Sequence, residues 1–299
     1  MNSYKKIFKS QNLRFKILKF LSFIPTPMML KIQYRIKLKR KLDLRNPIRF
    51  TEKLQWYKIN YRHELLTQCA DKYKVREFVE SVGEKDILTK IYGVYLKPEE
   101  INFNKLPDKF IIKTTNGCGT NFICEDKKKL DYDEVKKELG LWLKQNLYLA
   151  GREWSYKNIE PLIIIEELLE DTNNEFEGLN DYKFFCFDGE IKYIGLHVDR
   201  SIAHKRNIYD TEWNFVNVAS NHPNIDKEVE KPQNLDEMMR TVERLSKGFP
   251  FVRVDLYSVN NKIYFGEMTF YPWTGYVQFE PDQFDFELGS HFILPEKIL

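Results

Sequence analysis

The 299-residue sequence offers little that would place it in a membrane or hold it together covalently. Its longest aliphatic run, residues 162–165, is far too short to cross a bilayer. The N-terminus is basic but lacks an apolar core with a small-residue cleavage site, so no signal peptide is predicted. The four cysteines have no C-x-x-C spacing, which favours reduced thiols over disulfides or a metal site. These absences predict a cytoplasmic protein, and the 42% hydrophobic content predicts a globular one.

The charge is unevenly distributed along the chain. Residues 1–53 carry 15 Lys and Arg against two acids, a net +13, whereas the remaining chain has 32 basic and 42 acidic residues, a net −10. Such a segment predicts contact with something anionic. Apolar residues at helical spacing between residues 13 and 24 fit a helix on a membrane surface, and a solvated basic face covering the main domain fits equally well. No nucleic-acid-binding motif accompanies the charge, so no nucleic-acid partner is predicted.

Helical and strand-like segments alternate along the chain. Two helices are predicted within residues 4–42, broken at Pro25-Thr26-Pro27, and further helices begin at Thr51 and cover 71–82, 131–147 and 234–247. Strands are predicted at 87–95, 110–115, 121–124, 162–168, 181–187, 190–198, 251–258 and 262–269. Asp188-Gly189 and Asn260-Asn261 mark hairpin turns, so we expect antiparallel sheets and the α+β class rather than a doubly wound parallel sheet.

A lysine and a glycine-containing turn follow one predicted strand. Residues 110–112 are large and apolar, Lys113 follows them, and Gly117 and Gly119 flank a cysteine before Thr120. Backbone N–H groups of such a turn can approach polyphosphate without side-chain obstruction, and the lysine adds a point charge. No GK[ST] follows and no helix opens there, which excludes a Walker P-loop. An ordinary hairpin is the alternative interpretation.

The predicted strand 162–168 ends in acidic residues and leucines, among them Glu166, Glu167 and Leu168. Backbone groups at such a strand end can pair with the edge of an adenine. A carboxylate there can accept a hydrogen bond from the adenine amine or a ribose hydroxyl. A strand that simply runs out into solvent is the alternative.

The last predicted hairpin gathers charged residues on one face. A three-residue loop centred on Asn261 puts Asp255 opposite Glu267, and Arg253, two residues before Asp255, shares their face. Two carboxylates suit Mg²⁺ with nucleotide phosphates, and an arginine suits a phosphoryl group in transfer. A cross-strand salt bridge on the surface is the alternative.

In this order the motifs resemble the ATP-grasp superfamily over roughly residues 65–275. Asp71-Lys72 resembles the motif of its first ATP lysine, Lys113 its second ATP lysine, residues 116–121 its phosphate lid and residues 166–169 its adenine hinge. Arg253-Val254-Asp255 resembles its R-x-D motif, and Glu267-Met268-Thr269 resembles its E-x-N motif. Thr269 replaces the usual asparagine, and a hydroxyl is a poorer metal ligand than an amide carbonyl.

A narrower resemblance, to the TupA-like ATP-grasp family, covers nearly the whole chain. It rests on residues 46–47, 50, 52–56, 58, 71–72, 106–110 and 181–189. That family is associated with teichuronopeptide and other surface-polysaccharide biosynthesis. The resemblance implies an ATP-grasp fold, in which two α+β subdomains grip ATP between antiparallel sheets. It also implies a ligase that joins an amino acid or small amine to the carboxylate of a sugar, for which we expect a uronic acid.

The resemblance further implies roles for single residues. Lys72 and Lys113 would bind the ATP phosphates, Asp255 and Glu267, with Thr269, would hold Mg²⁺, and Arg253 would stabilise the transferring phosphoryl group. The reaction would pass through an acyl phosphate that the amine attacks, with no protein nucleophile. Residues 196–206 form a polar segment, from which Arg200, His204 and Arg206 are expected to join Lys183 around the γ-phosphate or the acceptor carboxylate.

We expect a basic helical segment at 1–58 and a catalytic domain at 59–299, with a glycine-loop subdomain at about 108–168 and a metal-binding subdomain at about 180–299. An anionic sugar or polysaccharide acceptor at the inner membrane face would explain the basic segment. The alternative function is a glycosyltransferase or sugar kinase of the same pathway. The literal D-x-D match at 131–133 opens a polar helix and is interpreted as a cap. A non-catalytic binding module is the third interpretation.

Overall fold

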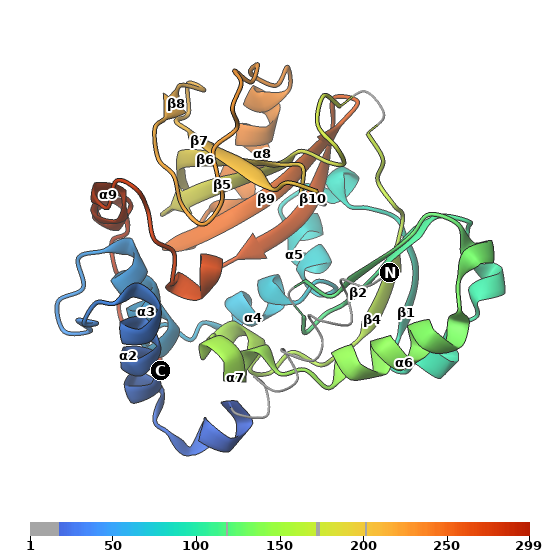
Figure 1. Cartoon of the computed structure of the whole chain (residues 1–299), viewed down its shortest axis with the longest axis horizontal. Helices are drawn as coiled ribbons and strands as arrows, with labels where there is room; N and C mark the ends of the chain where they lie inside the picture. Colours follow the sequence, from blue (N-terminus) through green and yellow to red (C-terminus); the bar gives the residue numbers. More distant parts are fainter. Residues whose placement is uncertain (1–17, 118, 172–173, 201) are drawn as a thin grey trace.

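The computed structural model describes residues 18–117, 119–171, 174–200 and 202–299 and contains two antiparallel sheets (Figure 1). The four-stranded sheet has the order β1-β4-β2-β3 and the six-stranded sheet the order β10-β9-β5-β6-β7-β8. The strands are β1 (Ile91–Tyr95), β2 (Phe110–Thr114), β3 (Asn121–Cys124), β4 (Ile163–Glu166), β5 (Asp181–Phe187), β6 (Glu190–Val198), β7 (Lys205–Tyr209), β8 (Phe215–Val216), β9 (Phe251–Val259) and β10 (Lys262–Thr269). This arrangement confirms the α+β class.

Helices surround both sheets. The α-helices are α2 (Thr26–Leu38), α3 (Phe50–Asn60), α4 (Glu64–Ala70), α5 (Val75–Ser81), α6 (Tyr132–Leu143), α7 (Leu147–Gly151), α8 (Leu235–Ser246) and α9 (Gln283–His291). The 3₁₀ helices are η1 (Leu21–Phe23), η2 (Lys85–Ile87), η3 (Pro98–Glu100), η4 (Phe103–Lys105), η5 (Lys127–Lys129), η6 (Trp154–Tyr156) and η7 (Pro272–Gly275). In Figure 1 the six-stranded sheet lies in the upper part of the molecule and the four-stranded sheet at the lower right.

The six-stranded sheet has two chemically different faces. Opposed residues in neighbouring strands share a face, and the register aligns Lys183 with Asp255 and Gly195, and His197 with Arg206. The residues between them point to the other face and are apolar, among them Phe184, Val254 and Leu196. That apolar face packs against α8 in the main hydrophobic core. One face of the sheet is therefore left to carry charged groups.

The four-stranded sheet has a smaller core of its own. Phe110, Ile112 and Ile165 are fully buried and pack with Leu139 and Trp142 of α6. Lys113 follows Ile112 and points to the opposite face, because side chains alternate along a strand. The apolar residues of β2 therefore face the core of this sheet, and Lys113 lies on its polar face.

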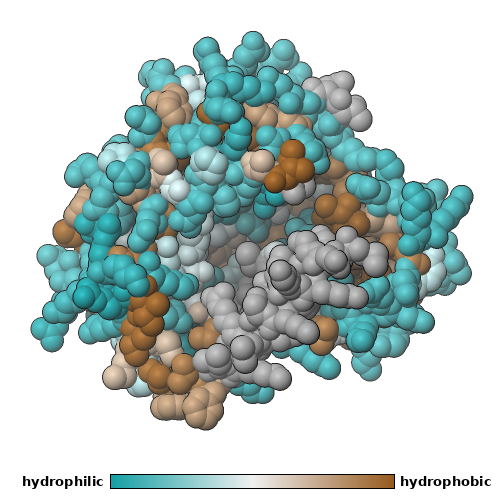
Figure 2. Space-filling model, in the orientation of Figure 1, coloured by the Kyte–Doolittle hydropathy of each residue, from teal (hydrophilic) through white to brown (hydrophobic). Residues whose placement is uncertain are grey.

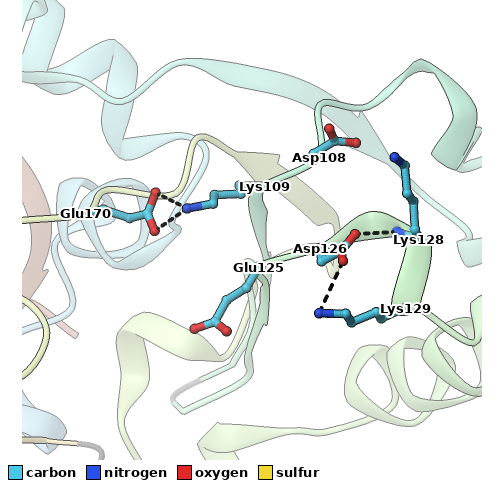
Figure 3. Close-up of a pocket in the computed structure, with 7 residues that line it drawn as sticks. All are labelled: Asp108, Lys109, Glu125, Asp126, Lys128, Lys129 and Glu170. Atoms are coloured by element: carbon cyan, nitrogen blue, oxygen red, sulfur yellow. Dashed lines mark hydrogen bonds and ion pairs between the residues drawn. The ribbon is translucent and has the colours of Figure 1, made fainter.

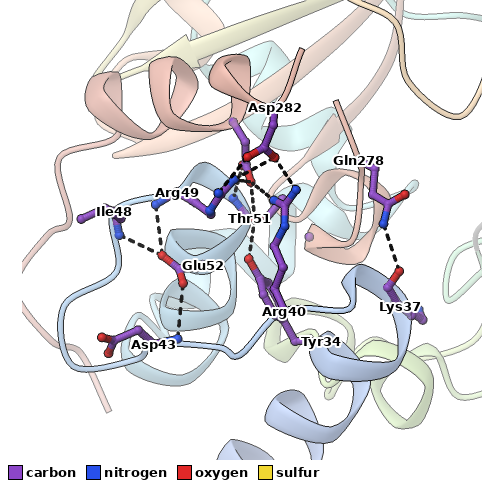
Figure 4. Close-up of polar contacts among 12 residues, drawn as sticks. Tyr34, Lys37, Arg40, Asp43, Ile48, Arg49, Thr51, Glu52, Gln278 and Asp282 are labelled. Carbon is purple, nitrogen blue, oxygen red and sulfur yellow. Dashed lines mark hydrogen bonds and ion pairs between the residues drawn. The ribbon is translucent and has the colours of Figure 1, made fainter. Parts of the chain in front are cut away.

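Polar contacts fasten α3 to α9 and to the preceding loop (Figure 4). The Glu52 carboxylate accepts hydrogen bonds from the backbone N–H groups of Ile48 and Arg49, at 3.1 and 3.2 Å, and closes the start of the helix. Thr51 binds Asp285 of α9 through its backbone N–H and its hydroxyl, at 3.0 and 2.8 Å. The conspicuous sequence 50–58 is therefore largely a structural segment that joins the N-terminal part to the sheet domain.

The structure describes the second of the two predicted N-terminal helices and only the end of the first. Residues 1–17, which hold most of the first predicted helix, lie outside the described residues, while α2 begins directly after the predicted break at Pro25. Within the part of the chain that the structure describes, no helix is long and apolar enough to cross a membrane.

Several predicted boundaries differ from the structure. The helix predicted from residue 71 begins at Val75, because Asp71 turns the chain with its Oδ1 accepting from the N–H groups of Tyr73 and Lys74. The strand predicted from residue 87 begins at Ile91, after η2. The helix predicted at 131–147 ends at Leu143, and its start is capped by Asp131, as expected from the sequence.

Candidate active site

The candidate site is built on the polar face of the six-stranded sheet by the β9–β10 hairpin. The turn contains two residues, Asn260 and Asn261, both with positive φ (51° and 60°), and not the predicted three. A register shift between Phe265 and Glu267 compensates for the shorter loop, so Asp255 still lies opposite Glu267. The predicted pairing is therefore correct, but a bulge and not the turn produces it.

Arg253 links both carboxylates of this hairpin. Its Nε and Nη2 donate to the two carboxylate oxygens of Asp255 at 2.7 Å each, and Nη2 also donates to Glu267 at 3.2 Å. The Thr269 hydroxyl lies 3.1 Å from the same Nη2 and 3.0 Å from Glu267 Oε1. Arg253 and Asp255 are both buried, whereas Glu267 is half-exposed at the rim.

The charges continue across the sheet with alternating sign. Lys183 donates to Asp255 and lies 2.7 Å from Asp181, and Arg200 Nη1 lies 2.6 Å from the same Asp181 carboxylate. Lys183 and Asp181 are buried on β5, while Arg200 is half-exposed after β6. Each buried charge thus has a counter-charge, which limits the cost of removing it from water.

The electrostatics keep Glu267 ionised. Burial alone would raise the pKa of its carboxyl group, but Arg253, Lys183 and Lys72 outweigh it and lower that pKa to about 2. Lys72 belongs to the segment before α5, far from Glu267 in the sequence. Its charge nevertheless acts on Glu267, so the two residues belong to one site.

Lys72 also reaches the glycine loop. Its Nζ donates to the backbone carbonyl of Gly117. A Cβ at Gly117 would collide with the Thr120 hydroxyl, which bonds to Thr114 at 2.9 Å, and Gly119 has a φ of +73°. A side chain at either position would therefore be strained. Cys118, between them, lies outside the described residues.

Lys113 and Glu166 form an ion pair on the neighbouring sheet. Lys113 Nζ donates to Glu166 Oε2 at 2.7 Å, and Arg76 Nη1 lies 3.6 Å from Oε1 of this buried carboxylate. Glu167 accepts from the backbone N–H of Lys90 at 2.8 Å, and Leu168 follows it beyond the end of β4. The carboxylate of Glu166 thus positions the lysine.

Arg206, on β7, adds a further cation to the polar face. Arg206 is buried and its guanidinium lies 4.7 Å from the centroid of the Trp273 ring. Among the described residues neither of its Nη atoms has a hydrogen-bond partner. Burial, followed by the charge of Arg253, lowers the pKa of Arg206 to about 10. A buried guanidinium with open donors is the group in this site that most requires an anionic ligand.

Three histidines lie near Arg206. His197 Nδ1 lies 2.9 Å from His204 Nε2, and the ring centroids of His204 and His222 are 3.9 Å apart. Burial and the charges of Lys183 and Arg206 hold the pKa of His197 well below its ordinary value. Burial and the neighbouring His222 lower the pKa of His204 to about 4. Both rings are therefore neutral at pH 7.

Part of this cluster escapes the sequence interpretation, which singles out none of His197, His222 and Trp273. The alternation of β6 puts His197 on the face of Lys183, which is a signal that the sequence does contain. Nothing local in the sequence joins His222 or Trp273 to Arg206, because His222 comes from a loop and Trp273 from η7.

The carboxylates fit Mg²⁺ in part. No group of three or more His, Cys, Asp or Glu residues among the described positions is arranged to hold a metal ion. Asp255 and Glu267 supply two carboxylates, and Mg²⁺ usually completes its octahedron with waters and substrate phosphates. The donor set therefore suits a metal that arrives with a nucleotide, not a permanently bound one.

A separate surface cavity of about 620 Å³ lies at the opposite end of β2 from Lys113 (Figure 3). It is lined by Asp108, Lys109, Glu125, Asp126, Lys128, Lys129 and Glu170. Two ion pairs lie among these charges, Lys109 with Glu170 at 2.7 Å and Lys129 with Asp126 at 3.3 Å. This cavity is not part of the candidate site.

The chain resembles solved ATP-dependent enzymes at low identity. D-alanine–D-alanine ligase from Bacillus anthracis, complexed with ATP, is 15% identical over 69% of this chain and 56% of its own, with a TM-score of 0.42. The ATP-grasp ligase PsnB with its minimal precursor is 14% identical over 73% of this chain and 59% of its own, with a TM-score of 0.41. The ADP complex of PurK, an N5-carboxyaminoimidazole ribonucleotide synthetase, is 12% identical over 72% of this chain and 49% of its own, with a TM-score of 0.44.

The chain thus spans about half the length of these solved enzymes. No curated protein matches it. The family model of the TupA-like ATP-grasp proteins matches residues 52–293, which contain every residue of the candidate site. This protein belongs to the TupA-like ATP-grasp family.

Proposed function

We propose that the protein is an ATP-dependent carboxylate–amine ligase that joins an amino acid or small amine to the carboxylate of a sugar. Family membership supports ATP as the energy source. The observation that carries the proposal is the array of Arg253, Asp255 and Glu267 facing Lys72 and the glycine loop. This array offers cations for phosphates and carboxylates for a divalent metal within one site.

In this proposal the chain binds ATP between its two sheets. Lys72 and Lys113 bind the α- and β-phosphates, and the loop of Gly117, Gly119 and Thr120 covers them. The end of β4, with Glu166, Glu167 and Leu168, holds the adenine. Asp255 and Glu267, with the Thr269 hydroxyl near them, hold Mg²⁺, which neutralises charge on the phosphates.

The remaining residues bind and orient the acceptor. Its carboxylate attacks the γ-phosphorus and ADP leaves; the amine then attacks the acyl carbon, loses a proton and displaces phosphate. Arg253 stabilises the phosphoryl group in transfer. Lys183, Arg200, His204 and Arg206 surround the acceptor carboxylate, and the open Nη atoms of Arg206 support this assignment.

The domain organisation follows the sheets. We assign residues 59–299 to catalysis, with β2, β3 and β4 in a glycine-loop subdomain at about 108–168 and the six-stranded sheet in a metal-binding subdomain at about 180–299, while β1 joins the four-stranded sheet from outside these bounds. The acceptor is an anionic sugar or polysaccharide, with a uronic acid preferred, which would link the protein to surface-polysaccharide biosynthesis. The basic segment 1–58 would bring the enzyme to such an acceptor at the inner membrane face.

The test is ADP release from Mg·ATP with a panel of uronic acids, each with and without amino acids or small amines. Release that requires both a carboxylate and an amine supports the ligase. Release with a sugar alone, insensitive to amine, would instead identify a sugar kinase. Asp255→Asn should abolish release, while Asp236→Asn, which changes an exposed carboxylate on α8, should leave release and its Mg²⁺ requirement unchanged.

A further inference from the structure

Helix α2 has two apolar faces. On one face Leu30, Tyr34 and Leu38 are buried and pack with Leu42 and Tyr276. On the other face Met28, Ile32 and Ile36 recur every four residues and are 58%, 41% and 62% exposed. Residues four apart lie one above another on a helix, so these three form a continuous exposed stripe.

The stripe continues into the turn that precedes the helix. Phe20 and Phe23 are 78% and 74% exposed, and their rings pack edge to face with centroids 6.4 Å apart. Apolar side chains gather at the lower left of the space-filling view, where α2 and η1 lie in Figure 1 (Figure 2). Large apolar side chains clustered on a surface mark an interaction site.

The segment that carries the stripe is basic. Residues 18–42 contain seven Lys and Arg and no acid. Lys31 and Arg35 flank the stripe on α2 and are exposed, as is Lys19 beside Phe20. A protein partner that covered this face would need acidic residues around an apolar groove, whereas an anionic bilayer offers both the charge and the apolar layer.

The face is held rigidly to the domain. Tyr34 bonds to Thr51 of α3 at 2.8 Å, and Gln33 accepts from the Tyr276 hydroxyl at 2.8 Å. The guanidinium of Arg152 donates to the backbone carbonyls of Leu21, Ser22 and Ile24 at 3.3 to 3.4 Å and fixes the turn that presents the two phenylalanines. The exposed apolar groups are thus part of a built surface and not a frayed end.

We propose that this face, defined as Phe20, Phe23, Met28, Ile32 and Ile36 with Lys19, Lys31 and Arg35, docks on an anionic lipid bilayer. The apolar stripe enters the boundary between headgroups and acyl chains, and the basic side chains contact anionic headgroups. The proposed function includes membrane contact by residues 1–58, and this proposal names the face that makes it. The exposed stripe and the basic side chains support it independently of the ligase activity. Tyr276 ties the face to the segment that carries Trp273. Docking would therefore hold Trp273, and Arg206 beside it, on the membrane side of the protein.

The test is co-sedimentation of the full chain with vesicles of phosphatidylcholine, alone or mixed with phosphatidylglycerol. We expect binding that requires the anionic lipid and weakens with salt. The double variant Ile32→Gln, Ile36→Gln should lose roughly tenfold or more in apparent affinity, since it removes the centre of the stripe. The double variant Lys31→Gln, Arg35→Gln should lose affinity mainly at low salt. Ile123→Gln, a 56% exposed position on β3, is the matched control and should bind as the unchanged protein does.

Two results would overturn the proposal. Equal vesicle binding by the Ile32, Ile36 double variant and the unchanged protein would place any membrane contact elsewhere, such as residues 1–17. Self-association that the double variant abolishes, without vesicle binding, would mean that a second copy covers the stripe. Thermal unfolding checks that the variants fold. ADP release with soluble substrates should be unchanged in the double variant, so failure of the ligase proposal and failure of the docking proposal give different results.

Discussion

The guanidinium carbon of Arg206 lies over the indole ring of Trp273, 4.7 Å from its centroid. Trp273 and Thr274 both have positive φ, 51° and 55°, which side chains other than glycine adopt at a cost. Lys58 and Gln55 of α3 hold this unusual turn by donating to the Thr274 carbonyl at 2.9 and 3.2 Å. A helix outside the sheet therefore holds the turn that places Trp273 against the buried cation.

We predict that Lys58→Met weakens acceptor binding without affecting ATP. Lys58 Nζ also donates to Gln55 Oε1 and the Gly151 carbonyl, at 3.0 Å each, so the variant leaves buried acceptors unpaired and costs about 1–3 kcal/mol of stability. The acceptor KM should rise while the Kd for ATP stays unchanged. Lys53→Met is the control: Lys53 donates to two carbonyls at the end of α9, so it should lose stability but keep its KM. Equal KM changes in both variants would refute a positioning role for Lys58.

Arg253→Met should depress kcat by about a hundredfold or more, because the side chain is assigned to charge that develops during phosphoryl transfer. The Kd for ATP, measured by calorimetry, should change little. Arg253→Lys keeps the charge but cannot hold both Asp255 oxygens with one planar fork, so it should recover a minor part of kcat. Parallel losses in kcat and ATP affinity would instead assign Arg253 to ground-state binding.

Gly266→Ala should disturb the bulge that aligns the two carboxylates. A Cβ at residue 266 would lie 2.9 Å from the Asp255 carbonyl oxygen and 3.2 Å from the Tyr257 ring. We expect a loss of about 1–3 kcal/mol in denaturant unfolding and a higher Mg²⁺ requirement for ADP release. Gly140→Ala, in the middle of α6 with open space around it, should stabilise the protein by about 0.5–1 kcal/mol. An unchanged Mg²⁺ requirement in Gly266→Ala would show that the bulge does not affect metal binding.

Stability should fall as the pH drops below about 6.5, partly because of His197. Its folded pKa is lowered by burial and by Lys183 and Arg206, so the unfolded chain takes up a proton that the folded chain does not. The free energy of unfolding therefore decreases by up to about 1.4 kcal/mol per pH unit below the unfolded pKa. His197→Gln should flatten this slope between pH 6.5 and 5, measured by denaturant titration. An identical slope in the variant would show that His197 takes up its proton in the folded state.

Much of this architecture could be predicted because side chains alternate along strands. The hairpin at Asp188-Gly189 is confirmed, with φ of 51° and 81° at the two residues, and the Asp255–Glu267 pairing is correct. The bulge at Gly266 could not be predicted, since it depends on how the backbone of β9 crowds that glycine. The cluster around Arg206 also escaped prediction, because Trp273 of η7 and His222 of a loop are brought to it by the tertiary fold.

Lys183 and Arg253 both pair with the buried carboxylate of Asp255. A divalent cation that arrives alone at this carboxylate would leave two cationic side chains without a counter-charge. A polyphosphate that arrives alone at the cations would leave the buried carboxylate without one. When both arrive together, every group keeps a counter-charge, so we expect metal and polyphosphate to bind with positive cooperativity. The coupling is reciprocal: titrations should find that the nucleotide raises the affinity for the metal by the same factor as the metal raises the affinity for the nucleotide.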